Sequence, residues 1–320
     1  AIVAAEDNTD VDVRLVGGAT VLPDRDGRVR AAGGHVANRL AAQEVMLVHS
    51  APSPNIFTVT DLSGAQVTAN KPISVFAVHV CTNYPQDQAA CDHLQEQLLP
   101  VDTWGNSFQL VPPATRARNA PREVIYWKII GTNADANITL SVPFNQLQPM
   151  APGAAGVPDC RNFLNGQDTI RLRPDQFCEF GTKRAVQLVS DTPIMVAGFI
   201  VGQEATGLLD FGSHAGDPAM FIVPPDRQYR RSYGFLTPDT YFSDYVTVTY
   251  LPGNELLLDG QPIDLADGIQ VPGSNYFYKH VPVDDGPHLI EGRSLFGIMV
   301  YAYDDFVSYA FTGGLNLTKQ

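Results

Sequence analysis

The sequence predicts an all-β protein built from about three related antiparallel β-sandwich units, with one short helix in a disulfide-closed insertion. Two observations indicate this class. Proline and glycine are frequent, 24 and 27 of 320 residues, and they interrupt almost every helical pattern. Between them lie short segments that alternate apolar and polar residues with the period of two that is typical of strands. Only residues 91–99 and 36–43 have a helical pattern.

Three segments share one order of features: an apolar strand, a polar turn and an alternating strand that contains threonine. They are residues 44–64, 123–143 and 232–253. Repeats of about 100 residues are too long for a solenoid and suit sandwich domains. We therefore expect three units, at residues 1–103, 104–215 and 216–320.

The charge balance excludes some partners. The chain has 34 acidic and 21 basic residues, a net charge of −13, whereas nucleic acids and anionic membranes bind basic surfaces. No run of 18 apolar residues is present, so no membrane span is expected. Residues 1–6 lack the basic start and apolar core of a signal peptide, which fits a mature chain whose leader has been removed.

Four cysteines form an even set: Cys81, Cys91, Cys160 and Cys178. They contain no Cys-x-x-Cys pair, which argues against a zinc ribbon or a redox motif. We expect two local disulfides, Cys81–Cys91 and Cys160–Cys178, and hence an oxidising, extracellular compartment. Each closed loop is expected to add about 3 kcal/mol of stability. The alternative is four buried free thiols.

Two blocks of sequence carry a family resemblance. The first, residues 81–116, contains Cys…Cys-Asp-His-Leu…Glu-Gln…Pro…Trp-Gly…Phe…Val-Pro. The second contains Gly-Asp-Pro and, further along, Gln-Tyr. Together they resemble the N-terminal domain family of the IgGFc-binding protein. The matching residues to which we assign a structural role are Asp92, His93, Leu94, Gln97, Trp104, Gly105, Gly216, Asp217, Pro218, Gln228 and Tyr229.

This resemblance implies an adhesion or recognition module. Similar domains occur in large extracellular and mucus-associated proteins and in secreted bacterial proteins. We therefore expect a secreted or cell-surface, non-catalytic chain that binds a glycoprotein, a glycan or another protein partner, without a cofactor.

Three possible catalytic or metal-binding motifs have simpler explanations. Asp92, His93 and Glu96 have a helical spacing that could bring them together, but Asp92 is also a suitable helix N-cap. The segment 212–216 has His214 where a nucleophile elbow needs serine. Gly216-Asp217-Pro218 resembles a self-cleavage site of some mucin-associated domains, but alanine follows it instead of histidine. We expect no enzyme.

Acidic residues cluster at 6–10, at Asp24 and Asp26, at Asp284-Asp285 and at Asp304-Asp305. Such loops can bind calcium in extracellular β domains. None follows the twelve-residue calcium-loop pattern, and solvated turns or protected sheet edges explain them better. We therefore expect no cofactor, with bound calcium as the alternative.

Aromatic residues could form a binding face. Strand alternation over 275–278 places Tyr276 and Tyr278 on one face and Phe277 on the other, so the two tyrosines are the expected surface pair. Trp104 is expected in the core. The other aromatic residues near turns are Tyr84, Tyr241, Phe242, Tyr245 and Tyr303.

Two other functions remain open. One is a structural subunit of an extracellular fibre or surface layer, in which a strand at residues 11–16 adds to a neighbour's sheet. The other is a secreted glycan hydrolase, for which Asp92 and Glu96 are the nominated carboxylates.

Overall fold

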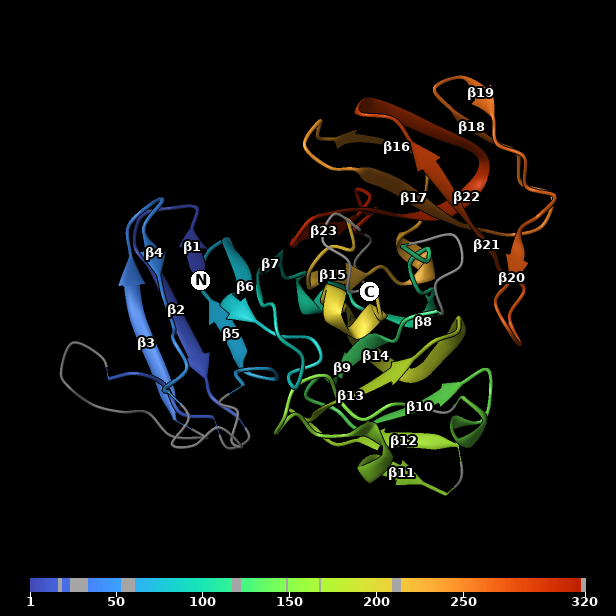
Figure 1. Cartoon of the computed structure of the whole chain (residues 1–320). Helices are drawn as coiled ribbons and strands as arrows, with labels where there is room; N and C mark the ends of the chain where they lie inside the picture. Colours follow the sequence, from blue (N-terminus) through green and yellow to red (C-terminus); the bar gives the residue numbers. More distant parts are fainter. Residues whose placement is uncertain are drawn as a thin grey trace.

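The structure, a computed structural model, describes residues 1–16, 19–23, 34–52, 61–116, 122–147, 149–166, 168–208 and 214–317. The described residues form strands and five short 3-10 helices, without an α-helix (Figure 1). The prediction of an all-β protein is confirmed. No helical segment in these ranges is long and apolar enough to cross a membrane.

The first strand group packs two small sheets around an apolar core (Figure 1). One sheet has the order β4-β1-β6-β7 and the other the order β3-β2-β5. The strands are β1 (Ile2–Ala4), β2 (Thr9–Arg14), β3 (His35–Leu40), β4 (Val45–Met46), β5 (Gln66–Ala69), β6 (Ile73–Thr82) and β7 (Asp92–Gln97).

The second strand group is a sandwich organised by one long strand, β14. Its first half pairs with β8 and β10, and its second half pairs with β9 and β15. The largest side chain in the core is Trp127, which is fully buried. The elements are η1 (Val101–Thr103), β8 (Gly105–Leu110), β9 (Ile125–Ile130), β10 (Ala136–Leu140), η2 (Phe144–Gln146), η3 (Cys160–Phe163), β11 (Leu164–Asn165), β12 (Thr169–Leu172), β13 (Phe177–Thr182), β14 (Val186–Ile200), η4 (Gln203–Thr206) and β15 (Ala219–Val223).

The third strand group repeats this plan around β22. The first half of β22 pairs with β16 and β18, and its second half pairs with β17 and β23. Tyr301 and Tyr303 from β22 belong to the core of the second group, so the two groups pack closely. The elements are η5 (Asp226–Gln228), β16 (Arg230–Thr237), β17 (Ser243–Tyr250), β18 (Leu256–Leu258), β19 (Gln261–Pro262), β20 (Ile269–Gln270), β21 (Phe277–Val283), β22 (Gly286–Asp304) and β23 (Val307–Thr312).

The second and third strand groups share a register shift at the same place in the long strand, and this shift allows their residues to be aligned one by one. The register along β14 shifts between Val189 and Ile194, opposite β8, and along β22 between Glu291 and Phe296, opposite β16. Strand β8 therefore corresponds to β16, and β9 corresponds to β17. This matching order supports repeated units in the second and third groups.

The segments that we aligned from the sequence are offset by one strand. They equate 123–143, which contains β9 and β10, with 232–253, which contains β16 and β17. Period-two alternation cannot distinguish one strand from the next, so only the pairing reveals the offset. Within the segment 44–64, residues 53–60 lie outside the described residues. The division into three domains stays a prediction, although β15 pairs within the second group and favours a boundary after Val223.

Both segments for which we predicted a helical pattern form strands. Residues 92–97 are β7, which pairs with β6 next to the Cys81–Cys91 disulfide, and residues 35–40 are β3, which pairs with β2. Around Leu94, exposed and buried side chains alternate, as in a strand with one face toward a core. An available strand edge thus outweighs local helix propensity here.

The strand that we predicted at residues 11–16 is not available to a neighbour. Strand β2 covers Thr9–Arg14 and lies in the middle of its own sheet, between β3 and β5. Its backbone groups are paired on both sides, so the prediction that this strand adds to a neighbour's sheet in a fibre is wrong.

Candidate functional site

The two blocks that carry the family resemblance meet in the structure. The amide Nε2 of Gln228 donates to the carbonyl oxygen of Thr103 at 2.9 Å, and the Arg227 guanidinium donates to the carbonyl oxygen of Trp104. Gln228 is fully buried. We call this contact, between residues 103–109 and 225–229, the junction.

A carboxylate continues the junction along β8. Asp226 accepts hydrogen bonds from Ser107 Oγ at 2.6 Å and from Gln109 Nε2 at 3.1 Å. Burial raises the pKa of Asp226 to about 6, although both hydrogen bonds oppose this shift. The junction therefore joins the second and third strand groups through buried polar contacts.

Close packing explains two of the matching residues at the junction. A side chain at Gly105 would collide with the ring of Pro225, so glycine lets the two segments approach. Tyr229 is 4% exposed, and its ring meets Tyr276 edge-on at 5.9 Å. The geometry is that of an internal contact, beside a small cavity of about 30 Å³ that Gln109 and Tyr229 help to line.

The second block also contacts β23, close to the start of β7. Asp217 is 3% exposed, and its backbone N–H donates to Ser308 Oγ at 2.9 Å. Burial raises the pKa of Asp217 to about 6, and the nearby charge of Asp92 adds to this effect. Oδ1 of Asp217 has no hydrogen-bond partner among the described residues. Gly216 has a φ of 70° and turns the chain into this position.

The nominated catalytic pair does not converge. In strand β7, Asp92 and Glu96 lie on the same face as the buried Leu94, about 13 Å apart along the strand. His93 is exposed on the opposite face. Asp92 Oδ1 accepts from the His93 backbone N–H at 2.6 Å, so Asp92 does not cap a helix.

The burial of Glu96 predicts that the stability of the protein depends on pH. Burial raises its pKa to about 7, so the folded chain binds a proton that the unfolded chain releases near pH 4.5. Stability should therefore fall as the pH rises from about 4.5 to 7. We expect Glu96→Gln to raise the free energy of unfolding by about 1–3 kcal/mol at about pH 8, and to have little effect near pH 4.

Urea unfolding at both pH values measures this difference. The control is Glu291→Gln, because Glu291 is exposed on a strand of the third group, and a surface change of this kind alters stability by less than about 0.5 kcal/mol. An equal effect of Glu96→Gln at both pH values would contradict the assignment.

A buried charged cluster connects the first and second strand groups. Lys128 Nζ donates to Asp61 Oδ2 at 2.8 Å, while Tyr84 donates to Glu179 Oε2 at 3.0 Å. Burial raises the pKa of Glu179, partly offset by the charge of Lys128. The charge of Lys128 holds the pKa of Asp61 below its usual value despite burial.

A second buried ion pair lies between the second and third groups. Arg116 and Glu123 are 2.8 Å apart, and their side chains are 1% and 9% exposed. The Arg116 guanidinium also donates to the carbonyl oxygens of Ala215 and Val201 and lies 4.6 Å from the ring centre of Tyr303. All these charges have partners inside the protein, which indicates a structural role.

One group of side chains has the composition of a metal site. His214, Asp304 and Asp305 offer ligand atoms within 4.8 Å of one another. His214 Nδ1 is 2.6 Å from Asp304 Oδ1, and the imidazole stacks on Phe242 at 3.9 Å. The sequence placed His214 and the two aspartates in separate motifs. An imidazole–carboxylate hydrogen bond accounts for this contact without an ion.

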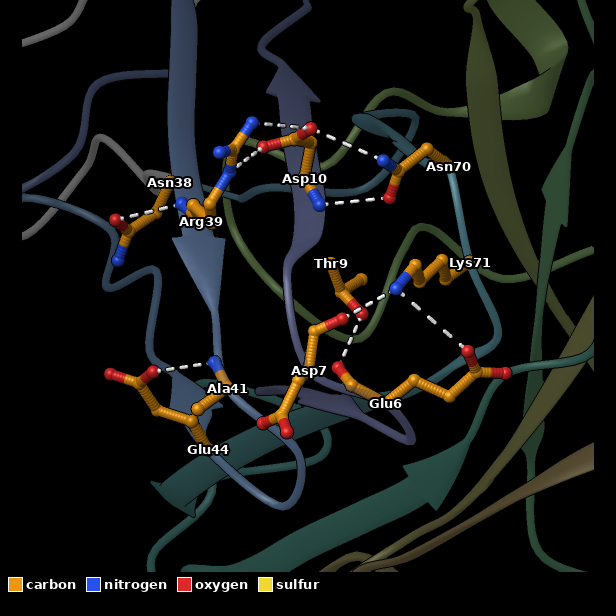
Figure 2. Close-up of polar contacts among 10 residues, drawn as sticks. All are labelled: Glu6, Asp7, Thr9, Asp10, Asn38, Arg39, Ala41, Glu44, Asn70 and Lys71. Atoms are coloured by element: carbon orange, nitrogen blue, oxygen red, sulfur yellow. Dashed lines mark hydrogen bonds and ion pairs between the residues drawn. The ribbon is translucent and has the colours of Figure 1, made fainter.

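The first acidic cluster forms a stabilised turn (Figure 2). Thr9 Oγ1 donates to the Glu6 carbonyl oxygen at 2.7 Å, and Lys71 Nζ donates to the Asp7 carbonyl oxygen at 2.5 Å. Asp10 holds Arg39 through two hydrogen bonds, of 2.6 and 3.0 Å. These contacts fit the interpretation of this cluster as a solvated turn better than its interpretation as a calcium-binding loop. Asp24 and Asp26 lie outside the described residues.

Beside this turn, β2, β3 and β5 form an open hollow of about 550 Å³. Its lining mixes polar residues with apolar ones, namely Asp10, Asp12, Asn38, Thr68 and Asn70 with Val11, Ala37 and Ala69.

The prediction of a tyrosine surface pair is wrong. Tyr278 is 2% exposed and packs with Val111, Ala185 and Val271 between the second and third groups, and Tyr276 is half-buried. The strand alternation was sound, but both faces of this strand are covered. Tyr84 and Tyr303 are also buried, Trp104, Tyr241 and Tyr245 are half-buried, and Phe242 is 67% exposed.

The structure joins Cys81 to Cys91 and Cys160 to Cys178. The first bond closes the loop between β6 and β7 at the surface, and the second is fully buried in the core of the second group. The described residues include no free cysteine.

The family model of the IgGFc binding protein matches residues 1–302. The chain belongs to this family. The human IgGFc-binding protein is 31% identical over 118 residues, which is 37% of this chain and 2% of the human protein. The chain thus spans a small fraction of this relative, whose whole activity does not transfer with the match.

Within this IgGFc-binding family member, sequence reasoning missed Lys128, Arg116 and Asp226. Each is a charged residue in or beside a β segment, where a charge is unusual in a buried position. An ionisable residue in an otherwise apolar strand such as 125–130 was the available signal.

Proposed function

We propose that this chain is a secreted, non-catalytic recognition module that binds a protein partner. Membership of the IgGFc-binding family over residues 1–302 carries this proposal. The name of the human relative describes binding to a protein, and we extend only that class of partner to this chain.

The arrangement of charged groups supports a binding scaffold rather than a catalytic one. Lys128, Arg116 and Asp226 each bond to groups of the protein interior. The junction residues connect the strand groups, which supports a structural role for the family motif. Two disulfides suit the oxidising conditions outside the cell.

A binding panel tests this function. The purified chain is immobilised and exposed to immunoglobulin Fc fragments and mucosal glycoproteins, each before and after enzymatic removal of glycans. We expect saturable binding to at least one protein that persists after glycan removal. Binding lost with the glycans would replace this proposal with glycan recognition, and filaments of the chain alone in electron micrographs would favour the structural subunit.

A further inference from the structure

The third strand group exposes an apolar sheet face. Leu236 in β16, Leu289 in β22 and Leu257 in β18 are 61%, 45% and 37% exposed. Leu236 pairs with Pro287 and Gly234 pairs with Leu289, so these side-chain positions share one face. Leu257 pairs with Glu291 of β22 and with Pro262 of β19, so the same face continues across β18 and β19 and also contains the exposed carboxylate of Glu291. We call this surface the β16–β18 face.

The equivalent face of the second group is covered by the chain itself. The register shift matches Ser107, Gln109 and Val111 with Ser232, Gly234 and Leu236. Gln109 is 4% exposed and Val111 6% exposed, because the third group packs over them. Ser107 and Gln109 bond to Asp226, Gln109 also bonds to Ser274, and Val111 packs with Val271 and Tyr278. This part of a sandwich therefore serves as a docking surface within the protein.

On the third group, no described segment covers the corresponding positions. Gly234 replaces Gln109, and a side chain added at Gly234 would meet only one backbone oxygen, 4.0 Å away. The position that Gln109 fills in the second group is thus open to a side chain from another molecule.

The edge of β16 offers backbone groups beside this face. The backbone N–H and C=O of Leu289 both bond to Asp259, on the side of β18, at 2.8 Å. Its partner Gly234 must then direct its own N–H and C=O away from β22, because the two groups of a strand residue point to one side. Ser232 and Leu236 share this direction. Within the described ranges, no other strand pairs with β16 on that side.

Charge distinguishes the two ends of this edge. Arg230 and Arg231 are exposed at the start of β16, and their guanidinium groups make no ion pair in the part of the chain described. At the other end, Thr237 Oγ1 donates to the carbonyl oxygen of Asp284, next to Asp285. Glu291, opposite Ser232, is the exposed carboxylate at the first end, and the two arginines outnumber it. An acidic group on a partner would therefore be attracted to the first end and repelled from the second.

We propose that the β16–β18 face binds an extended segment of a partner protein, added as a strand beside β16. Its alternate apolar side chains contact Leu236 and the open position at Gly234, and its acidic residue lies near Arg230 and Arg231. Backbone bonds supply affinity in this mode and the side chains supply specificity. The proposal rests on the proposed protein-binding function and names its surface.

Short random peptides displayed on phage, selected against the whole chain, test this site. We expect the selected peptides to alternate apolar residues and to have an acidic residue at one end. Hydrogen exchange of the complex should show slower exchange for the amides of Ser232, Gly234 and Leu236. Slower exchange elsewhere, for example in the hollow around Asp12 and Asn70, would overturn the proposal, and so would a failure to select any peptide.

Matched variants separate the site from the fold. Leu236→Asp places a charge on the face, so we expect peptide affinity to fall by at least tenfold, about 1.4 kcal/mol. Val189→Asp alters a residue of the second group that is 41% exposed, and it should leave affinity unchanged. Equal affinities of the two variants would refute the site. If Leu236→Asp bound a protein of the panel as tightly as the unaltered chain does, the site would fail while the proposed function stood.

Discussion

Replacing Lys128 with alanine is expected to lower the free energy of unfolding by about 3–5 kcal/mol. The side chain is 9% exposed, and its ammonium donates to Asp61 at 2.8 Å. Its charge also opposes the effect of burial on the pKa of Glu179. Without Lys128, the buried Glu179 and the half-buried Asp61 lose their cation, and each must either remain charged with little water around it or take up a proton.

Urea unfolding at neutral pH measures this loss, and Lys279→Ala is the control. Lys279 pairs with Asp267, whose side chain is 71% exposed, so its loss should cost less than about 1 kcal/mol. Equal losses in the two variants would show that water reaches the cluster and that Lys128 stabilises little.

The strands were predictable where one face of a sheet is buried and the other is solvated. Strand β10 alternates buried and exposed residues, and the sequence over 136–140 has that period. The sequence did not predict strand β7, because Asp92–Gln97 contains one apolar residue, Leu94, and a single residue cannot show a period of two. Its strand form depends on pairing with β6, a tertiary contact that local sequence does not encode.

The contacts of the charged cluster and of the junction were not predictable, because their members are far apart in the chain. Lys128 and Asp61 are separated by 67 positions, and Gln228 and Thr103 by 125. The family resemblance did locate both sides of the junction, since it selected Trp104, Gly105, Gln228 and Tyr229. It did not show that they touch one another, and that contact is what explains the presence of glycine and glutamine at these positions.

Removing the buried disulfide is expected to have a comparably large effect. The double change Cys160→Ala and Cys178→Ala should lower the free energy of unfolding by about 3–5 kcal/mol. The loop spans 18 positions, for which chain entropy accounts for about 3 kcal/mol. Both cysteines are fully buried in the core around Trp127 and Phe180, so the smaller alanines also leave a cavity.

The double change Cys81→Ala and Cys91→Ala is the matched comparison. This pair closes 10 positions at the surface, where lost side-chain volume leaves no cavity. From loop length alone, the two disulfides should differ in their contributions to the free energy of unfolding by only about 0.5 kcal/mol. A larger difference in urea unfolding would measure the contribution of core packing at Cys160 and Cys178. A difference at or below the entropic value would mean that the core closes around the alanines and that both bonds act only on the unfolded chain.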